Sequence, residues 1–203
     1  MNPFFSVIVP THNSQGYIRK GLNSIKEQTF TDYELIIICD SCTDNTINIA
    51  KQYTDKVYEI VAHSPGSSRN KGLEMATGQW ILFMDDDDWF LHNYVFEMLH
   101  DRLLNFKKDF LVFSFIFNTR GYVSANLNIA AWSKAWRREF LIKNNIRFAD
   151  TPVSEDVPFA EKAHKIGKAE YWDMPFYYYN YLRIGSLSYR MEQGEFSDED
   201  STT

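Results

Sequence analysis

The stretch WILFMDDDDW, residues 80–89, places four consecutive carboxylates directly after an apolar run. Adjacent aspartates repel one another, so a folded chain keeps such a cluster only where solvent, a cation or a raised pKa relieves the repulsion. Mg²⁺ and Mn²⁺ favour carboxylate oxygen, and Mg²⁺ commonly takes one or two carboxylates together with phosphate oxygens. The cluster therefore predicts a divalent cation that neutralises a diphosphate, held by Asp85 and Asp87 or by Asp87 and Asp88.

The aspartates allow two other interpretations. A calcium loop of the EF-hand type fails on spacing, because a loop starting at Asp85 would carry Phe90 at the glycine position and Phe96 at position 12. A solvated acidic turn is common for Asp-rich segments. It leaves unexplained why this segment ends a buried strand and is followed by Trp89 and Phe90.

Short apolar runs alternate with helical patterns in the first half of the chain. We expect strands at residues 4–10, 33–39, 56–62 and 79–84, with helices between them. Asn13 or Ser14 is expected to cap the first helix. Such alternation predicts an α/β fold with a mostly parallel central sheet flanked by helices. Ligands of such sheets bind outside the carboxyl ends of the strands, where Asp40 and the Asp cluster fall.

The second half is less regular. We expect helices at 94–104, 134–144 and 155–167, a strand at 110–117, and a last strand at 169–182. Within this last strand, FYYYNY at 176–181 concentrates aromatic side chains and points to a planar or ring-shaped ligand. A chain of 203 residues is long enough to bury one core, so we expect a single domain.

Composition and charge narrow the partners. The net charge of −6 and the lack of a basic run argue against nucleic acid. No apolar stretch reaches 18 residues and the first residues do not look like a signal peptide, so a cytoplasmic protein is expected. Cys39 and Cys42 form a C-x-x-C, but the other ligands of a zinc site are missing, so small buried side chains are favoured over zinc or redox chemistry.

Five motifs in order resemble the family 2 glycosyltransferases: SVIVPTHN, ELIIICDSCTDNT, SSRNKGLEMATGQWILFMDDDDW, AWSKAWRREFL and SEDVPF. The resemblance runs from Ser6 to Ser188. It implies an inverting, metal-dependent enzyme of the glycosyltransferase A fold, which is Rossmann-like. Such an enzyme moves a sugar from a nucleotide diphosphate donor, here expected to be a UDP-sugar, to a saccharide or lipid-linked acceptor. Bacterial surface polysaccharide synthesis is the expected setting.

On the donor side, the resemblance gives roles to five residues. Pro10, Thr11 and Asn13 match the segment that lies along the nucleoside, and Asp40 matches the carboxylate that accepts a hydrogen bond from uracil N3–H. Arg69 matches a basic residue near the nucleobase or the phosphates. Departures such as Cys39 and Cys42, where many members carry Asp and Ser, leave the nucleobase open.

At the reaction centre, Asp85 and Asp87 match the D-x-D motif. Asp85 is expected near the ribose or the cation, and Asp87 is the better ligand of Mn²⁺ or Mg²⁺. Asp88 is expected to face the donor sugar. SEDVPF matches the segment of the catalytic base, which we assign to Asp156 with Glu155 as its neighbour, because the acceptor hydroxyl must lose a proton as it attacks. Without the resemblance, both acids would fit the first turn of a helix after Ser154 equally well.

Three further residues complete the expected site. Trp132 and Lys134 match a W-x-K segment that forms one wall. Arg183, with Ser186 and Ser188, resembles a segment that folds over the diphosphate.

The resemblance divides the domain into a nucleotide-sugar-binding half at 1–92 and an acceptor-side half at 93–190, with a disordered acidic tail at 191–203. Many relatives continue into further helices, so acceptor contacts are expected to lie beyond this chain. Peripheral contact with the inner face of a membrane and the oligomeric state stay open. Two alternatives remain: a catalytically inactive nucleotide-sugar binder, and a nucleotidyltransferase, although PTHNSQGY lacks the Gly-rich basic loop that usually cradles a triphosphate.

Overall fold

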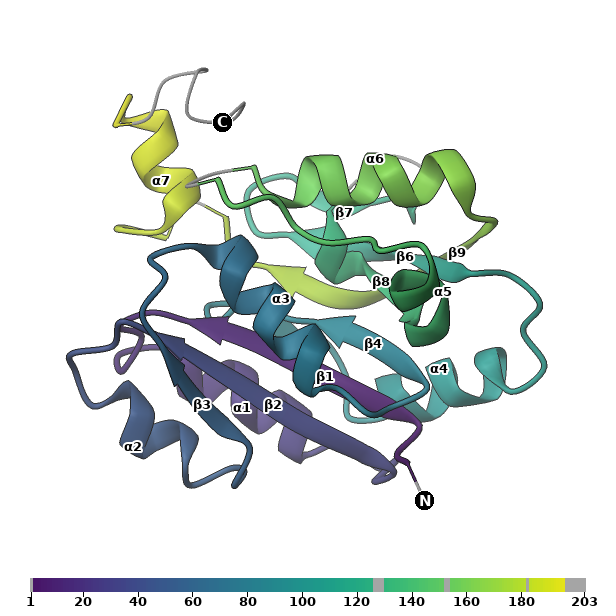
Figure 1. Cartoon of the computed structure of the whole chain (residues 1–203), viewed down its shortest axis with the longest axis horizontal. Coiled ribbons are helices and arrows are strands. Elements are labelled where there is room, and N and C mark those ends of the chain that lie inside the picture. Colours follow the sequence, from purple (N-terminus) through teal and green to yellow (C-terminus); the bar gives the residue numbers. More distant parts are fainter. Residues whose placement is uncertain (1, 126–129, 152–153, 182, 196–203) are drawn as a thin grey trace.

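The computed structural model describes residues 2–125, 130–151, 154–181 and 183–195, and these form one mixed sheet with helices on both faces (Figure 1). Within this part of the chain, the strands run in the order β3-β2-β1-β4-β8-β6-β9-β5, and β7 pairs with β6. The strands are β1 (Phe5–Thr11), β2 (Tyr33–Asp40), β3 (Val57–Ile60), β4 (Trp80–Phe83), β5 (Trp89–Phe90), β6 (Phe110–Phe117), β7 (Gly121–Val123), β8 (Lys134–Arg137) and β9 (Ala169–Tyr179).

The predicted α/β class with a mostly parallel sheet is confirmed. Strands β1 to β4 are mutually parallel, and β6 runs parallel to β9. β8 is antiparallel to both β4 and β6, so β6 runs in the same direction as β4. The carboxyl ends of six strands therefore meet at one edge of the sheet, as the sequence predicts for the ligand site.

The helices connect the strands and cover the sheet. They are α1 (Ile18–Lys26), α2 (Thr46–Ala50), α3 (Pro65–Met75), α4 (Val95–Leu103), α5 (Arg138–Lys143), α6 (Asp156–Ile166) and α7 (Leu187–Glu192), with a 3₁₀ turn η2 at Ala131–Ser133. Helix α3 crosses one face of β1 and β2, and α1 lies on the opposite face (Figure 1). Pro65 at the start of α3 and the Ser64 hydroxyl, which accepts from the Ser67 N–H, fix where that helix begins.

Two local predictions are wrong. The helix expected at 134–144 begins only at Arg138, because Lys134–Arg137 pairs with β4 on one side and β6 on the other. Helix α1 begins at Ile18 without a side-chain cap. The tail expected at 191–203 starts inside α7, while residues 196–203 and position 182 of the last strand lie outside the described part.

A buried carboxylate ties the strands together at the edge opposite the ligand site. Glu34 at the start of β2 accepts hydrogen bonds from the Ser6 hydroxyl at 2.5 Å, from the Thr77 N–H at 2.6 Å and from the Gly78 N–H at 3.1 Å, and it pairs with Lys56. Burial alone would raise the pKa of Glu34, but these partners outweigh it and lower the pKa to about 2. The carboxylate therefore holds the amino ends of β1, β2 and β4 in register.

Candidate active site

The four aspartates follow β4 in a tight turn, and each carboxylate has a different protein partner. The Asp85 N–H donates to the Tyr177 hydroxyl of β9 at 3.0 Å, and the Asp88 N–H donates to the Asp85 carbonyl at 3.2 Å. Gly21 of α1 packs directly against this turn, because a Cβ at that position would lie 2.6 Å from the Asp88 carbonyl oxygen. Each carboxylate is thus held by its own hydrogen-bond donors, although the four still repel one another.

Asp85 is bound by Arg69 of α3. The Nη2 atom of Arg69 donates to Asp85 Oδ1 at 2.6 Å, and the Nη1 atom donates to Glu155. Arg69 is 6% exposed. Burial by itself lowers the pKa of Arg69, but Asp85 and Glu155 outweigh it and hold the pKa above its ordinary value. One buried cation thereby joins the turn after β4 to the segment that begins α6.

Asp86 faces the loop after β1. Its Oδ2 atom accepts from the hydroxyls of Thr11 at 2.7 Å and Ser14 at 2.6 Å, and from the His12 N–H at 3.3 Å. Ser14 is also fixed by its own N–H, which donates to Thr46 at 2.7 Å. No role was predicted for Asp86, yet it is the aspartate that connects the turn to the segment expected along the nucleoside.

Asp87 is paired with Arg183, which follows β9. Arg183 Nε donates to Asp87 Oδ2 at 2.9 Å, and the guanidinium lies 3.7 Å from the centre of the Tyr17 ring. Burial raises the pKa of Asp87, reinforced by repulsion from Asp86 and Asp85, and Arg183 counteracts the rise so that the pKa is about 7. Arg183, which the sequence predicts over the diphosphate, is thus joined to the Asp turn by a direct ion pair.

Asp88 points into the protein. It is fully buried, its Oδ2 accepts from the Tyr177 hydroxyl at 2.7 Å, and its Oδ1 accepts from the Asn180 N–H at 2.8 Å. Burial, reinforced by Asp87, raises the pKa of Asp88 well above its ordinary value. This geometry does not favour the sugar-facing role expected for Asp88. It favours a role in holding β9 against the turn.

Asp40 at the end of β2 organises the loop that leads into α3. Its carboxylate accepts the N–H groups of Ala62 at 2.8 Å, His63 at 3.0 Å and Ser64 at 2.9 Å. Burial raises the pKa of Asp40, but these three donors outweigh it and the pKa lies below its ordinary value. Most of the acceptor capacity of this carboxylate is already used, so a nucleobase N–H would share it with the loop.

The loops at this edge carry unusual backbone angles. Positive φ values occur at Asn13 (48°), Ser41 (53°), His63 (54°) and Ser154 (58°). Non-glycine residues rarely adopt this region, and such residues cluster at functional sites where surrounding contacts hold them. Asn13 shows such contacts, because its side-chain oxygen accepts from the Thr43 N–H at 2.8 Å. Pro10 precedes this loop as a buried residue of β1.

The candidate base lies beside a buried lysine. Asp156 is the first residue of α6, and it accepts a hydrogen bond from the Ala131 N–H in η2. Burial raises the pKa of Asp156, and Arg69 opposes the rise. Lys134 is fully buried and donates to the Ala130 carbonyl at 2.6 Å. Burial lowers the pKa of Lys134 to about 7, against the opposing influence of Asp156.

Trp132, which the sequence predicts as part of one wall of the site, packs against Tyr177 of β9. Its ring stacks on Tyr177 with centroids 4.7 Å apart and an angle of 14°, and it is 7% exposed. Because Tyr177 also contacts Asp85 and Asp88, the wall and the Asp turn are one packed unit. Sequence reasoning missed Tyr177, although FYYYNY was the signal that contained it.

Asp85 and Asp87 fit a divalent cation whose remaining ligands are phosphate oxygens. Within the described ranges, no three His, Cys, Asp or Glu side chains are arranged to hold a metal ion by themselves. Asp85 and Asp87 keep 24% and 13% of their side-chain surface, so a ligand can reach both. Two reachable carboxylates are what Mg²⁺ or Mn²⁺ needs when diphosphate oxygens complete its shell. Cys39 and Cys42 are free thiols, with Cys39 buried.

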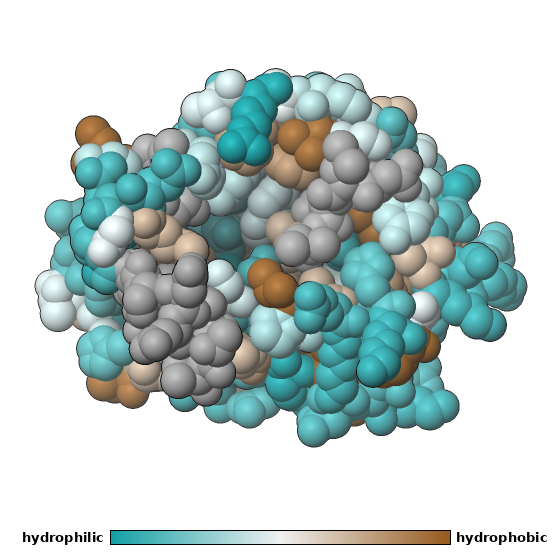
Figure 2. Space-filling view, turned by 90° about the horizontal axis from the view of Figure 1, so that it is seen from above, coloured by the Kyte–Doolittle hydropathy of each residue, from teal (hydrophilic) through white to brown (hydrophobic). Residues whose placement is uncertain are grey.

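One face of the molecule has a hollow. Figure 2 looks down on the face that carries α6, α7 and β7, and it shows a hollow with hydrophilic side chains at its floor. Of the described helices, none is long and apolar enough to cross a bilayer.

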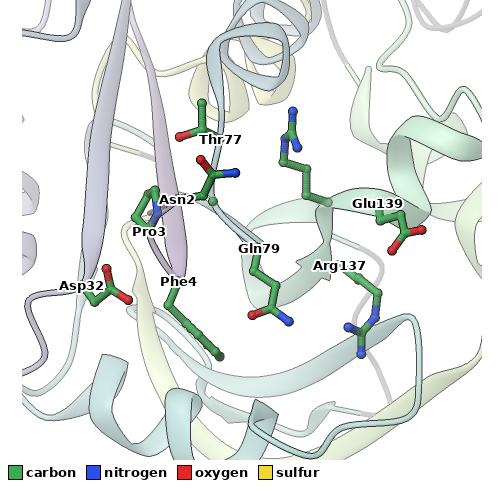
Figure 3. Close-up of a pocket in the computed structure, with 10 residues that line it drawn as sticks. Asn2, Pro3, Phe4, Asp32, Thr77, Gln79, Arg137 and Glu139 are labelled. Carbon is green, nitrogen blue, oxygen red and sulfur yellow. The ribbon is translucent and has the colours of Figure 1, made fainter.

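A separate cavity of about 510 Å³ lies at the opposite edge of the sheet (Figure 3). It is lined by residues next to the amino ends of β1 and β4, including Phe4 and Gln79, and by Arg137 at the carboxyl end of the antiparallel strand β8. None of the predicted site residues lines it. Since ligands of parallel sheets bind at the carboxyl ends of the strands, this cavity is not the candidate active site.

The comparisons with known proteins agree on one family. The family model described as Glycosyl transferase family 2 matches residues 6–159. Poly(ribitol-phosphate) beta-N-acetylglucosaminyltransferase TarS of Staphylococcus aureus is 41% identical over 93 residues, which cover 42% of this chain and 16% of TarS. Glycosyltransferase GlyA of Streptococcus pneumoniae is 27% identical over 221 residues, covering 90% of this chain and 31% of GlyA.

A solved structure agrees with these sequence matches. The crystal structure of S. aureus TarS 1-349 in complex with UDP-GlcNAc superposes with a TM-score of 0.81 and 27% identity, covering 93% of this chain and 61% of that one. The chain thus spans less than two thirds of the length of each of these relatives. The fold is that of the glycosyltransferase A enzymes, and the resemblance seen in the sequence motifs is confirmed. Because the family model matches most of its length, the chain belongs to glycosyltransferase family 2.

Proposed function

We propose that this chain carries the catalytic site of an inverting glycosyltransferase that moves a sugar from a nucleotide diphosphate donor to a saccharide or lipid-linked acceptor. Family membership supports the reaction class. The observation that carries the proposal is Arg69, whose guanidinium donates to Asp85 of the D-x-D turn and to Glu155 beside the candidate base. This connection would hold the donor phosphates, bound at the Asp turn, at a fixed distance from the base at the start of α6.

A UDP-sugar is the proposed donor. TarS has been solved with UDP-GlcNAc, and its similarity to this chain supports the same donor class here. TarS acts on poly(ribitol phosphate), as its name states, which supports a polymer of the bacterial surface as the acceptor. The nucleoside would lie along Pro10, Thr11 and Asn13, with Asp40 and its loop at the base.

Asp156 is the proposed base, with Trp132 and Lys134 as the wall beside it. The acceptor oxygen bonds to the anomeric carbon while the bond from that carbon to the diphosphate oxygen breaks on the opposite side. The acceptor proton passes to the Asp156 carboxylate, and the nucleoside diphosphate leaves with its negative charge. Burial favours this transfer, because a carboxylate with a raised pKa holds a proton better.

The Asp turn and its arginines handle the charge of the leaving group. Asp85 and Asp87 would hold Mn²⁺ or Mg²⁺, which when bound stabilises the negative charge that develops on the diphosphate. Arg183 donates to Asp87, one of these two carboxylates. When a cation replaces the guanidinium at Asp87, Arg183 can turn toward the diphosphate. Preorganised positive charge of this kind acts where negative charge grows in the transition state.

The test is release of nucleoside diphosphate from a panel of nucleotide sugars, with and without acceptor polymers, for the native chain and Asp156→Asn. The expected result is release of UDP from a UDP-sugar and a loss of about 100-fold or more in Asp156→Asn, since general base catalysis contributes roughly 10²–10⁴. Glu74→Gln on the exposed side of α3 is the control. Release of pyrophosphate in a parallel assay with a nucleoside triphosphate and a sugar 1-phosphate would point to a nucleotidyltransferase. Binding without turnover over the whole panel would favour an inactive binder.

A further inference from the structure

Cys39 and Cys42 are a pair of free thiols that the proposed chemistry does not use. The sequence favours two small buried side chains here, but only Cys39, near the end of β2, is buried, and Cys42 in the following loop is half-buried. Ser41 between them has a φ of 53°, so the chain turns sharply where β2 ends. The two thiols meet across this turn and share a hydrogen bond.

The two thiols differ in how readily they ionise. The hydrogen bond from Cys39 is the largest influence on Cys42, because it stabilises a negative charge on that sulfur. The Asn13 N–H and His12 act in the same direction, whereas burial and Asp44 oppose them. The pKa of Cys42 is lowered to about 7 as a result, while the same hydrogen bond and burial raise the pKa of Cys39. Since the thiolate is the nucleophilic form of cysteine, Cys42 is the reactive member of the pair.

A cavity gives small molecules access to this pair. Its volume is about 250 Å³, and both cysteines line it, together with Ile47 of α2 and with Glu59 and Val61 at the end of β3. β3 is an edge strand of the sheet, and Val61 is 83% exposed. A small oxidant can therefore enter from solvent and reach the Cys42 sulfur.

The cavity lies on the opposite face of the sheet from the expected nucleobase. Successive side chains of a strand point to opposite faces, so Asp40 faces away from Cys39. The Asp40 carboxylate accepts from the Ser68 hydroxyl of α3 at 3.4 Å, whereas the cavity is bounded by Ile47 of α2. A chemical change at Cys42 would thus act on the nucleotide through the loop, and not by filling the nucleotide site.

The loop that carries Cys42 is joined to the loop after β1. In its protonated form, the Cys42 thiol donates to the Thr11 carbonyl at 3.6 Å. The next residue, Thr43, donates its N–H to the Asn13 side-chain oxygen at 2.8 Å. Thr11 and Asn13 are two of the residues proposed to lie along the nucleoside. A change at the Cys42 sulfur therefore reaches that segment through direct contacts.

We propose that Cys39 and Cys42 form a peroxide-sensitive dithiol, and that its oxidation to a disulfide loosens the backbone of residues 11–14. The disulfide removes the thiol proton that Cys42 gives to the Thr11 carbonyl, and it draws the Cys42 sulfur from hydrogen-bonding contact to bonding distance with Cys39. The dithiol itself is independent of the proposed function. Its effect on nucleotide binding rests on that function.

The oxidation runs in two balanced steps. The Cys42 thiolate attacks one oxygen of hydrogen peroxide, an S–O bond forms as the O–O bond breaks, and the departing hydroxide takes up a proton to become water. The Cys39 sulfur then attacks the sulfur of the Cys42 sulfenic acid, an S–S bond forms as the S–O bond breaks, and hydroxide leaves with the Cys39 proton as water. Together the two thiols lose two electrons and two protons, and one peroxide becomes two waters.

The dithiol is tested by treating the reduced native chain with a small excess of hydrogen peroxide, followed by peptide mass spectrometry. The expected product is a disulfide between Cys39 and Cys42 that dithiothreitol reverses. Cys42→Ser should give no disulfide, and in Cys39→Ala dimedone should trap a sulfenic acid on Cys42. Thiols that stay reduced, or oxidation of Cys42 to sulfinic acid without a disulfide, would overturn the proposal.

Hydrogen exchange and calorimetry measure the effect on the loop. Oxidation should speed amide exchange in peptides that cover residues 11–14. It should also weaken binding of UDP in the presence of Mn²⁺ about two- to fivefold, the lower part of the range for one lost hydrogen bond, because a thiol is a weak donor. Cys42→Ser treated with the same peroxide should show neither change, which controls for oxidation of methionine.

The outcomes separate this inference from the proposed function. A disulfide that leaves the exchange of residues 11–14 unchanged would overturn the coupling between the dithiol and the loop. Faster exchange after oxidation, in a chain that binds no UDP even when reduced, would support the dithiol and count against the proposed function.

Discussion

Arg183 Nε lies 2.9 Å from Asp87 Oδ2, so the aspartate that we propose as a cation ligand is held by a guanidinium. The two residues are 96 positions apart in the sequence, and Arg183 belongs to the segment between β9 and α7. The same carboxylate oxygen cannot give its full charge to both partners. A cation at Asp87 must therefore compete with Arg183.

This competition predicts that Arg183→Gln strengthens binding of Mn²⁺ to the chain without nucleotide. We expect a gain of about three- to tenfold, because the ion pair removed is partly exposed and worth about 1 kcal/mol. Electron paramagnetic resonance of free Mn²⁺ during a titration measures this affinity directly. Arg190→Gln is the control, since Arg190 pairs with Glu195 away from the Asp turn. Unchanged or weaker binding in Arg183→Gln would refute competition.

Removal of Arg69 should destabilise the fold. Arg69→Met leaves the carboxylates of Asp85 and Glu155 without their shared cation, and breaking a buried ion pair costs roughly 3–5 kcal/mol. Arg102→Met is the matched control, because Arg102 pairs with Glu170 near the surface, where a pair is worth about 1 kcal/mol or less. Urea unfolding of both variants gives the comparison. Equal losses would mean that the Arg69 network contributes little to stability.

Gly21 should tolerate no side chain. A Cβ there would lie 2.6 Å from the Asp88 carbonyl and 2.8 Å from Met84 Cε, so Gly21→Ala must move the Asp turn. We expect a loss of about 1–3 kcal/mol in unfolding free energy, the usual cost of overpacking, together with weaker cation binding. Gly16→Ala provides the control, since nothing lies within 4 Å of its Cβ position. Equal behaviour of the two variants would contradict the close approach.

Glu34 should make the free energy of unfolding depend on pH in the acidic range. Its pKa in the fold is about 2 against about 4.5 in the unfolded chain, so its contribution is complete above pH 4.5 and is lost as the pH falls toward 2. The lowering corresponds to about 3 kcal/mol. Urea unfolding between pH 5 and pH 2.5 should show the advantage of the native chain over Glu34→Gln shrinking through this range. A constant difference would mean that the carboxylate is not preferentially charged in the fold.

Much of the fold could be read from the chain because its parallel strands are nearly continuous apolar runs. Strands β1, β2 and β4 coincide with such runs, and the edge where Asp40 and the Asp turn meet follows from their parallel arrangement. The strand at Lys134–Arg137 was missed because Lys, Ala and Arg favour helix locally. Pairing on both sides with β4 and β6 overrides that preference.

The partners inside the site were harder to foresee. Ser14 looked like a helix cap, but its hydroxyl is used by Asp86 and its N–H by Thr46, so α1 starts later. Asp88 looked like a sugar contact, and only the position of Tyr177 on β9 shows why it is buried. Contacts between residues so far apart in the chain leave no local trace in the sequence.

The most direct test of the account is calorimetric titration of UDP with and without Mn²⁺, on the native chain and on Asp87→Ala. Circular dichroism confirms that both proteins are folded. We expect binding to the native chain that requires Mn²⁺ and is largely lost in Asp87→Ala, because Asp87 would supply a ligand to the cation that neutralises the diphosphate. Equal binding of UDP by both proteins, with or without the metal, would contradict the central claim that the Asp turn is the seat of a cation.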